Sequence, residues 1–201
     1  MNKGKPMRDK IIQSFKESAK VKLKSLEDNL DMIIAVSEAI VSSFKKGGKL
    51  LLFGNGGSAA DAQHLAAEFV NKFLIERPPL PALALTTDSS IITSIANDDQ
   101  YSNIFARQIS ALGKKEDIVW GISTSGKSPN VINGLEMAKK IGIVTIGLTG
   151  NNGGKMAGIV DYHLHISSDS VPRVQEAHIT IGHIICETID CYLFQKSGKM
   201  I

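Results

Sequence analysis

The chain has 201 residues, a formal net charge of +3, and 43% hydrophobic residues against 21% charged ones. This length fits one domain with a sizeable core, and the composition is ordinary for a globular protein. Aromatic residues make up only 5% of the chain and do not interleave with a dense basic patch. The composition therefore lacks the usual signature of a nucleic-acid-binding protein.

The sequence also lacks the signals that direct a chain to a membrane. No apolar run approaches the roughly 20 residues needed to cross a bilayer, and the first residues lack the apolar stretch of a secretory signal. Cys186 and Cys191 are the only cysteines, and they lie five residues apart on different faces of a predicted helix. We expect two reduced thiols and a location in the cytoplasm.

Residues 8–46 form a long amphipathic segment. Apolar side chains recur in it mostly at spacings of three and four, and charged residues fill the other face. This pattern predicts one or two helices, which end at Gly47 and Gly48. A helical segment of this length needs a partner surface along its apolar face. We expect the core to supply part of that surface and a second subunit to supply the rest.

The rest of the chain alternates short apolar runs with helical segments. The apolar runs predict strands at residues 50–53, 82–85, 118–122, 144–148 and 161–166. Helices are predicted after the turn at 54–58, from about 86 to 96, over 103–112 and 130–140, and from about 170 to 195, with a short helical turn at 155–158.

Most of these strands are apolar throughout, which is typical of a parallel sheet covered on both faces. We therefore predict one α/β domain over residues 1–201, a three-layer αβα sandwich with a five-stranded parallel sheet and an N-terminal helical extension. Ligands of such folds bind beyond the carboxyl ends of the strands. The polar loops that follow the first, third and fourth strands lie where such a site is expected.

The turn at residues 123–128, Ser-Thr-Ser-Gly-Lys-Ser, follows a buried strand and precedes a helix. Hydroxyl groups and free backbone N–H groups in such a turn can surround a phosphate, and the helix dipole favours its charge. The alternative is an ordinary capping turn, because Ser and Thr favour such turns anyway. The spacing is not that of a P-loop, and the glycine turn at 54–58 does not match the dinucleotide-binding pattern.

Two helices carry the remaining candidate groups. His64 and Glu68 are four residues apart and share one helix face, so they can do acid–base or metal chemistry, although such a pair is often a surface pair. On the last helix, Gln175 and His183 lie eight residues apart, close to one face. Together these four side chains could build a His-Glu-Gln-His set suited to Zn²⁺ or a similar ion. The sequence does not show that the two helices meet.

The other histidines are interpreted structurally. His178 lies on a neighbouring side of the last helix within an apolar stretch, where a histidine is more often a satisfied core residue than a ligand. His163 and His165 alternate on the fifth predicted strand, and we expect them to form one solvated or edge face.

Eight motifs together resemble those of the sedoheptulose 7-phosphate isomerases, or phosphoheptose isomerases, of the sugar-isomerase (SIS) superfamily. They are GNGGSAADAQH at 54–64, LTTD at 85–88, AND at 96–98, NIFAR at 103–107, GISTSG at 121–126, SPNV at 128–131, LTG at 148–150 and RVQEAH at 173–178. The resemblance extends from about residue 20 to 195. Because the motifs are long and occur in order, it is more specific than any single constellation.

The resemblance implies a flavodoxin-like SIS domain that forms a homotetramer with active sites between subunits. It implies conversion of sedoheptulose 7-phosphate to D-glycero-D-manno-heptose 7-phosphate through a cis-enediol, the first step towards nucleotide-activated heptose for surface polysaccharides such as lipopolysaccharide. It also implies one Zn²⁺ per subunit, with ligands at the positions of His64, Glu68, Gln175 and His183. Glu68 and His183 match the acid–base pair. The matching substrate contacts are Asn55, Gly56, Gly57, Ser58, Glu68, Asn97, Asp98, Ser123, Thr124, Ser125, Ser128 and Gln175.

Two other functions are less favoured. DiaA-like proteins of the same superfamily resemble the chain in its glycine and Ser/Thr turns but bind the DnaA replication initiator. They would not need an acid–base pair, whereas Glu68 and His183 are both present here. A sugar-phosphate-sensing regulator would usually carry a DNA-binding segment, and residues 1–46 lack a clear helix-turn-helix. One departure is Pro172, which stands where some family members carry an acidic or small polar residue, so a polar contact near the substrate is expected to be missing.

Overall fold

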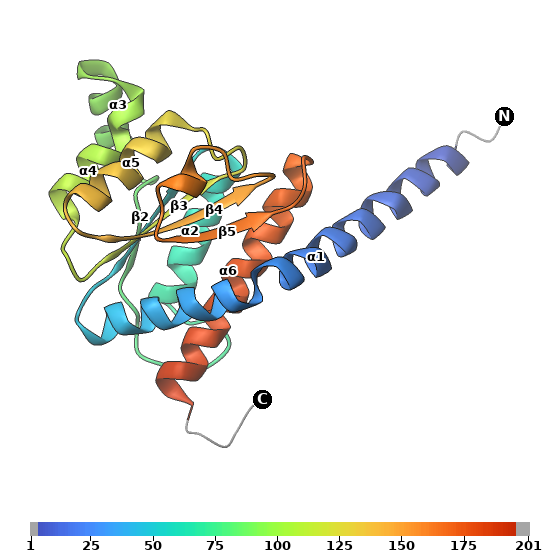
Figure 1. Ribbon diagram of the computed structural model, residues 1–201, viewed down its shortest axis with the longest axis horizontal. Coiled ribbons are helices and arrows are strands. Elements are labelled where there is room, and N and C mark those ends of the chain that lie inside the picture. Colours follow the sequence, from blue (N-terminus) through green and yellow to red (C-terminus); the bar gives the residue numbers. More distant parts are fainter. Residues whose placement is uncertain (1–3, 196–201) are drawn as a thin grey trace.

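The structure is a computed structural model that describes residues 4–195, so the two ends of the predicted domain, 1–3 and 196–201, lie outside the described residues. Five parallel strands form one sheet in the order β2-β1-β3-β4-β5 (Figure 1). Their bounds are Leu50–Gly54 (β1), Ala82–Ala84 (β2), Ile118–Ser123 (β3), Val144–Gly150 (β4) and Tyr162–Ile166 (β5).

Within residues 4–195, six α-helices and two short 3-10 helices connect and cover these strands. The α-helices are Gly4–Lys45 (α1), Gly57–Val70 (α2), Ser89–Asp98 (α3), Ile104–Leu112 (α4), Pro129–Lys140 (α5) and Val171–Phe194 (α6). The 3-10 helices are Tyr101–Asn103 (η1) and Met156–Gly158 (η2). The predicted helix at 103–112 therefore begins one residue later, after a 3-10 turn. The predicted strand at 161–166 begins at Tyr162, because the carboxylate of Asp161 instead accepts hydrogen bonds from Thr145.

The core has two layers, one on each face of the sheet. One cluster joins α1, α2 and α6 to the side chains of one sheet face, with Trp120 and Leu148 fully buried in it. The second cluster joins α4 and α5 to the opposite face around Phe53 and Phe105. This arrangement confirms the predicted three-layer sandwich. Strands buried on both faces need apolar side chains at every position, which is why their sequences do not alternate.

The order of the strands places a crevice between β1 and β3. Strand β1 pairs with β2 on one side and with β3 on the other, and Gly54 is in register with Ile122. The chain therefore leaves β1 and β3 at adjacent points of the carboxyl edge but continues in opposite directions across the sheet. Such a reversal is where α/β sheets bind ligands.

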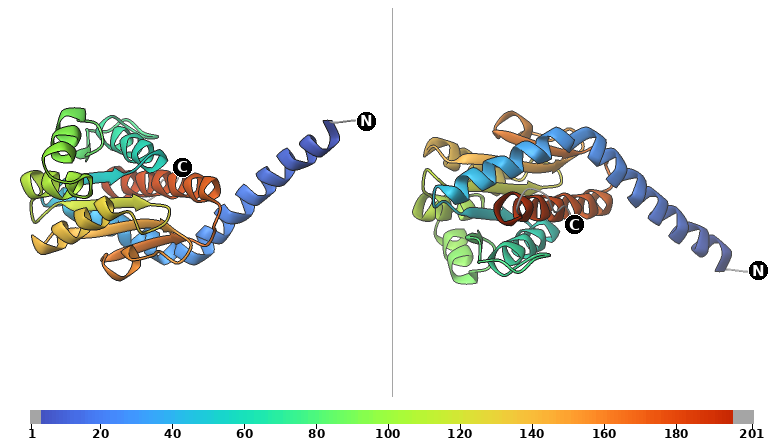
Figure 2. Two further views of the ribbon diagram at one scale, coloured as in Figure 1. Left: turned by 90° about the horizontal axis from the view of Figure 1, so that it is seen from above. Right: turned by 90° about the horizontal axis from the view of Figure 1, so that it is seen from below.

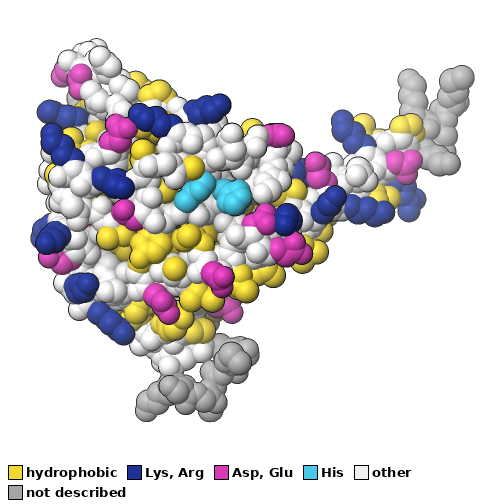
Figure 3. All heavy atoms as spheres, in the orientation of Figure 1, with side chains coloured by type: hydrophobic (Ala, Val, Ile, Leu, Met, Phe, Trp, Pro, Cys, Tyr) yellow, Lys and Arg dark blue, Asp and Glu magenta, His cyan; other side chains and the backbone are white. Residues whose placement is uncertain are grey.

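Residues 4–45 form one continuous helix, α1, and only part of its length packs against the domain. Its C-terminal part packs beside α6 and β5, and its N-terminal part projects away from the domain (Figures 1 and 2). The apolar stripe predicted for this helix is largely exposed, with Phe15 at 77% and Leu23 at 66%. Figure 3 shows hydrophobic side chains among Lys/Arg and Asp/Glu along the projecting part.

Polar residues of α1, rather than apolar ones, make several of its contacts with the body. Asn29 is buried, and its side-chain amide donates to the carbonyl of His165 and accepts from the N–H of the same residue. Because β5 is an edge strand, this side chain occupies hydrogen-bonding positions that a further strand would use. Farther out, the guanidinium of Arg173 donates to the carbonyl of Ser14.

The remaining side-chain predictions for the fold are largely confirmed. Cys186 and Cys191 are both free. His178 is fully buried, and its Nε2 lies 3.0 Å from the carbonyl oxygen of Thr149. His163 and His165 lie on edge strand β5 with their rings stacked, but His163 is half-buried rather than solvated because the 150–154 loop packs against it. No helix within residues 4–195 is long and apolar enough to cross a bilayer.

Candidate active site

The glycine turn after β1 starts helix α2 at the carboxyl edge of the sheet. Gly56 has a φ of +54°, a left-handed conformation that favours glycine, and it occupies the N-cap position of α2. No side chain caps the first turn of α2. The N–H groups of Ser58, Ala59 and Ala60 donate to the carbonyls of Asn55 and Gly56, so the N–H groups of the exposed Gly56 and Gly57 are the ones suited to an anion or a polar ligand. Gly56 and Gly57 are exposed, whereas Ser58 is buried beneath them.

The turn after β3 presents a cluster of hydroxyl groups. The Oγ of Ser123 lies 3.0 Å from that of Ser128 and 3.5 Å from that of Ser125. Ser128 is the N-cap of α5, so the hydroxyls gather at a helix N-terminus. Gly126, with a φ of +61°, lets this turn pack directly on the backbone of Gly153, where a Cβ atom would collide.

The two turns are held side by side by a pair of amides. Asn55, in the first turn, and Asn130, in the first turn of α5, exchange side-chain hydrogen bonds of 2.9 and 2.8 Å. The hydroxyl of Tyr101 lies 3.4 Å from Asn55 Oδ1. Asn130 is buried, so this contact fixes the position of Asn55 at the mouth of the crevice.

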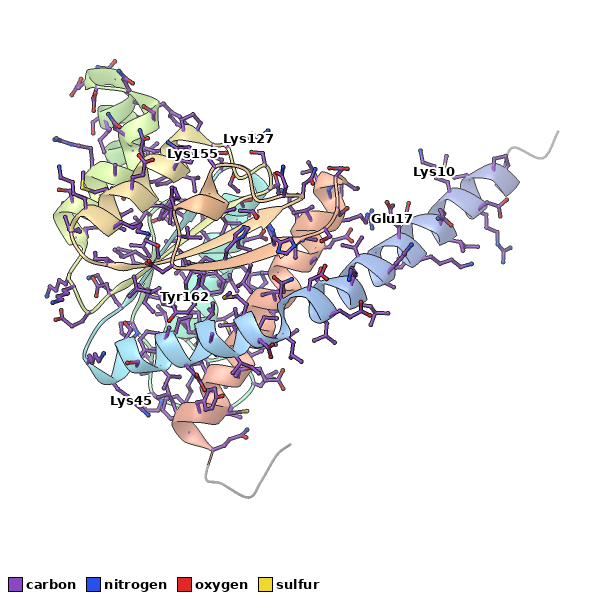
Figure 4. All side chains as sticks on the ribbon, in the orientation of Figure 1. Lys10, Glu17, Lys45, Lys127, Lys155 and Tyr162 are labelled. Atoms are coloured by element: carbon purple, nitrogen blue, oxygen red, sulfur yellow. The ribbon has the colours of Figure 1, made fainter. Side chains whose placement is uncertain are left out.

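A cleft of about 230 Å³ opens beside the hydroxyl turn. Thr124, Ser125 and Lys127 line one side of it, and Asn151, Asn152, Ser168 and Asp169 from the loops after β4 and β5 line the other. Lys127 lies in the hydroxyl turn after β3 and Lys155 in the loop after β4, and both are labelled in Figure 4. The Nζ of Lys155 lies 2.8 Å from Glu136, whereas Lys127 lines the cleft beside the neutral hydroxyl donors of the turn.

The contact between α2 and α6 brings together three of the predicted metal and acid–base residues. His64 Nε2 lies 3.0 Å from Glu68 Oε1 and 3.4 Å from His183 Nε2. One ligand atom from each residue can be chosen so that all three lie within 4.8 Å of one another. The sequence left open whether these helices meet, and the structure answers that they do.

Small residues at the contact explain the approach of the two helices. A Cβ atom on Gly182 would lie 2.5 Å from Leu65 Cδ2, so only glycine permits this spacing. Gly182 and Leu65 directly adjoin His183 and His64 in the sequence. The ring of Phe73, from the loop after α2, lies 5.3 Å from the ring of His183 and covers its other side.

Burial and neighbouring charges alter the protonation of this cluster. Partial burial lowers the pKa of His183, and the charge of His64 lowers it further, while Glu68 acts in the opposite direction. Burial raises the pKa of Asp61, one turn before His64, to about 6. Asp61 Oδ2 is buried and has no hydrogen-bond partner among the described residues.

The fourth predicted ligand, Gln175, lies elsewhere on α6. Its amide packs against Gly57 at the start of α2, where a Cβ atom would collide with it. Eight residues separate Gln175 from His183, which is about 12 Å along a helix. Glu68 likewise lies eleven residues beyond Gly57, about 16 Å along α2. In one chain, the hydroxyl turn and the His64–Glu68–His183 cluster are therefore at opposite ends of the contact between α2 and α6.

Asn97 and Asp98, the remaining predicted substrate contacts, end helix α3. Their side chains are exposed, and Asn97 Nδ2 donates to Asp98 Oδ1 at 2.7 Å. The sequence analysis did not identify Asn130 or Phe73. The position of Asn130 at the start of a helix after a polar turn was a usable signal, but nothing in the sequence pairs Phe73 with His183.

Comparison with known proteins gives the family. Residues 14–150 match the family model of the SIS domain. The chain is 52% identical to the phosphoheptose isomerase of Thermodesulfovibrio yellowstonii, with 93% of each chain covered. It superposes on the phosphoheptose isomerase of Francisella tularensis with a TM-score of 0.88 at 39% identity, covering 92% of this chain and 98% of that one. It superposes on phosphoheptose isomerase GmhA of Neisseria gonorrhoeae with a TM-score of 0.87 at 37% identity, and the match covers 92% of this chain and 98% of that one. The chain therefore belongs to the phosphoheptose isomerase family of SIS-domain proteins.

Proposed function

We propose that this chain converts sedoheptulose 7-phosphate to D-glycero-D-manno-heptose 7-phosphate, for the synthesis of activated heptose, with Glu68 and His183 as the proton-transfer pair. Its family makes it an isomerase of a heptose phosphate. The observation that carries the residue assignment is the convergence of Glu68 and His183 on His64. A non-catalytic DiaA-type protein would have no need of this cluster.

The reaction moves a proton between two adjacent carbons and another between their oxygens. The carboxylate of Glu68 would take a proton from C1 of the ketose, which gives a cis-enediol. It would then return the proton to C2 on the same face of the enediol. The imidazole of His183 would exchange a proton with the oxygens, and because burial lowers its pKa it would begin in the neutral form at pH 7. Positioned acid–base groups of this kind contribute roughly 10²–10⁴-fold to a rate.

The hydroxyl turn would bind the phosphate at the other end of the substrate. Ser123, Ser125 and Ser128 offer hydroxyl donors at the start of α5, where the helix dipole also favours an anion. Thr124 lines the cleft beside them. Binding energy from this remote group orients the reacting carbons, as expected when a substrate carries a phosphate that does not react.

The residues of the cluster also fit a divalent metal ion such as Zn²⁺. Two ligand atoms on a tetrahedral ion with bonds of about 2.0–2.1 Å are roughly 3.4 Å apart, and the two Nε2 atoms have this spacing. His64, Glu68 and His183 would hold the ion, and Gln175 would serve as a ligand only by leaving Gly57 or from a neighbouring subunit. A bound ion would polarise the carbonyl oxygen of the sugar. Elemental analysis of active protein tests this assignment, because activity without any divalent metal would remove it.

The separation of the two parts supports an assembly with shared active sites. Eight bonds join C1 of a heptose 7-phosphate to its phosphorus, so the molecule spans roughly 12 Å at most with bonds of about 1.5 Å. The backbone of Glu68 lies about 16 Å along α2 from Gly57, farther than this span, and its side chain points back towards the start of the helix. A homotetramer would allow one subunit to supply the turn and another the cluster. The exposed apolar stripe of α1 is the surface best suited to such an assembly.

The assembly is tested by a charge placed in this stripe. Phe15→Glu should convert the tetramer into smaller species in light scattering and abolish turnover, because a shared site requires two subunits. Lys10→Glu is the matched control, since Lys10 lies on the same projecting part of α1 (Figure 4) and changes charge without removing an apolar side chain. Full activity of a monomeric Phe15→Glu protein would contradict the shared site.

The reaction itself is tested by incubation with sedoheptulose 7-phosphate and measurement of the aldose formed. Aldose should appear with the wild-type protein, and a protein that binds the ketose phosphate without forming aldose would contradict the isomerase assignment. A location in the cytoplasm stays a prediction from the sequence, which fractionation of cells would test.

A further inference from the structure

Arg77 occupies the C-terminal end of helix α2, where backbone carbonyl groups have no partner within the helix. Its Nη2 donates to the carbonyl of Glu68 at 2.8 Å, and its Nη1 donates to the carbonyl of Phe69 at 2.8 Å. The side chain is only 1% exposed. A guanidinium at this place satisfies the last carbonyls and is favoured by the helix dipole. Arg77 thus holds the backbone of the residue that we assign as the base.

The same guanidinium is tied to helix α6. Arg77 Nε donates to Asp190 Oδ1 at 2.6 Å, and the Asp190 side chain is 3% exposed. Asp190 lies seven residues after His183, so the two side chains point from nearly the same face of α6. One buried group therefore connects the backbone of Glu68 to the helix that carries His183.

The segment that contains Arg77 also reaches the imidazole itself. Phe73, four residues earlier in the same loop, lies 5.3 Å from the His183 ring. The loop is further fixed by the N–H of Leu80, which donates to the carbonyl of Phe69. Helices α2 and α6 contact each other through side chains. Their position along each other is therefore not fixed by backbone hydrogen bonds, as it is for paired strands. A buried link at this end limits how far the helices can slide or rotate past each other.

We propose that Arg77 and Asp190 are positioning residues, which set the distance between Glu68 and His183 by locking the end of α2 against α6. The inference rests on the proposed roles of Glu68 and His183. Neither Arg77 nor Asp190 touches the reacting groups. Their effect is therefore on the rate of proton transfer, which depends steeply on distance, and not on binding of the phosphate, which is held at the other end of α2.

The first test compares Asp190→Asn and Arg77→Lys with the wild-type protein. Asparagine keeps an acceptor for Arg77 Nε but removes the charge, and lysine keeps the charge but cannot reach both carbonyls and the carboxylate at once. We expect kcat to fall by about tenfold for Asp190→Asn and by up to about 100-fold for Arg77→Lys, with KM changed less than about twofold.

The matched control is Asp117→Asn. Asp117 is equally buried, at 2% exposure, and pairs with Lys49 at 2.5 Å, but it lies at the amino edge of the sheet. The Asp117→Asn substitution should lower the melting temperature much as Asp190→Asn does, and it should leave kcat unchanged. Equal losses of kcat in the two variants at matched loss of stability would overturn the proposal.

A double variant separates positioning from stability. Replacing both Arg77 and Asp190 by leucine removes the buried charges together, which often preserves or raises stability. Because the carbonyls of Glu68 and Phe69 lose the guanidinium, we expect the melting temperature to recover in part while kcat stays low. Recovery of the melting temperature together with kcat would reduce the pair to a structural role.

The single variants separate the positioning role from the catalytic assignment. Wild-type kcat in Asp190→Asn and Arg77→Lys, together with an inactive Glu68→Gln protein, would overturn the positioning role but leave the catalytic assignment standing. An active Glu68→Gln protein would instead overturn the catalytic assignment.

Discussion

The carboxyl edge of the sheet and the contact between α2 and α6 are built by different means. At the edge, short polar side chains and backbone N–H groups are placed by strand, turn and helix in immediate succession, as at Ser123 and Ser128. At the helix contact, larger titratable groups meet across 119 residues of sequence, as His64 and His183 do. The first arrangement is local and neutral, whereas the second is non-local and its protonation depends on packing.

This difference divides the chemistry between the two regions. Neutral donors at helix starts can bind a dianionic phosphate without having to change their own protonation. A base and an acid must gain and lose protons, so they need surroundings that tune their pKa values. We expect damage at the edge to weaken substrate binding and damage at the helix contact to slow turnover.

The largest effect is expected from Glu68→Gln. Loss of the base should reduce kcat by roughly 10³-fold or more while KM stays within about threefold, because the phosphate turn is untouched. Steady-state kinetics with sedoheptulose 7-phosphate measure both constants. Glu116→Gln, an exposed glutamate in the loop before β3, is the control and should behave like the wild type. If Glu68→Gln raised KM and left kcat nearly unchanged, the helix contact would not be the region that governs turnover.

Gly182→Ala should act on the same region through packing. The added methyl group collides with Leu65, so α6 must move away from α2 and carry His183 with it. A shift of about 1 Å should reduce kcat by up to about 100-fold. Titration with Zn²⁺ followed by calorimetry should show weaker binding in the same variant. Unchanged kcat in a folded Gly182→Ala protein would mean that the close approach of the helices is not needed for turnover.

Ser123→Ala should produce the opposite kinetic pattern. A hydrogen bond to a charged group contributes about 1.5–3 kcal/mol, so KM should rise by about tenfold or more with little change in kcat. Lys127→Ala provides the contrast, because its ammonium group is exposed beside the turn, and we expect KM to rise by less than about threefold. A larger effect for Lys127 than for Ser123 would show that the phosphate is held by charge.

The smallest effect on turnover is expected from His178, which links α6 to Thr149 at the end of β4. Burial lowers the pKa of His178 to about 4, from an ordinary value of 6.5. The unfolded chain therefore binds more protons than the folded one between these values, and this group's contribution to stability, present above pH 6.5, is lost as the pH falls towards 4. Between pH 7 and pH 4.5, the free energy of unfolding of the wild type should fall by about 2 kcal/mol more than that of the His178→Gln variant. Denaturant unfolding at the two pH values measures this, and parallel losses would contradict it.

Much of the fold follows from local pattern. Continuous apolar runs such as 118–122 predict buried parallel strands, and polar turns after them predict a site at the carboxyl edge, which the structure confirms. What local pattern does not contain is the direction in which a helix faces. The apolar stripe of α1 splits along its length: Ile33, Val36 and Ile40 are buried in the core, whereas apolar side chains nearer the N-terminus, such as Phe15 and Leu23, are exposed.

The helix contact is the part of the site that the sequence left open. The spacing of His64 and Glu68 identifies a shared face, but their meeting with His183 depends on a glycine inside α6 and on a loop that returns Arg77 to the end of α2. These are tertiary contacts without a periodic signal. The small residues Ala62, Ala66 and Ala67 around His64 and Glu68, and Gly182 within an otherwise helical stretch, are local hints of a close approach.

The long helix α1 also has a consequence for how the protein is made. Its residues in the main core begin at Ile33, with Val21 only partly buried against it, so the sheet and both core layers can form without the projecting part. Helices in proteins gain most of their stability from tertiary packing of an apolar face, and the apolar face of the projecting part is exposed. A newly synthesised chain can therefore complete its domain first, and under the proposed assembly its N-terminal arm would become ordered on binding another copy. Amide hydrogen exchange should be fast before Val21 and slow after Ile33 in dilute protein, and dilution should change only the first of these rates.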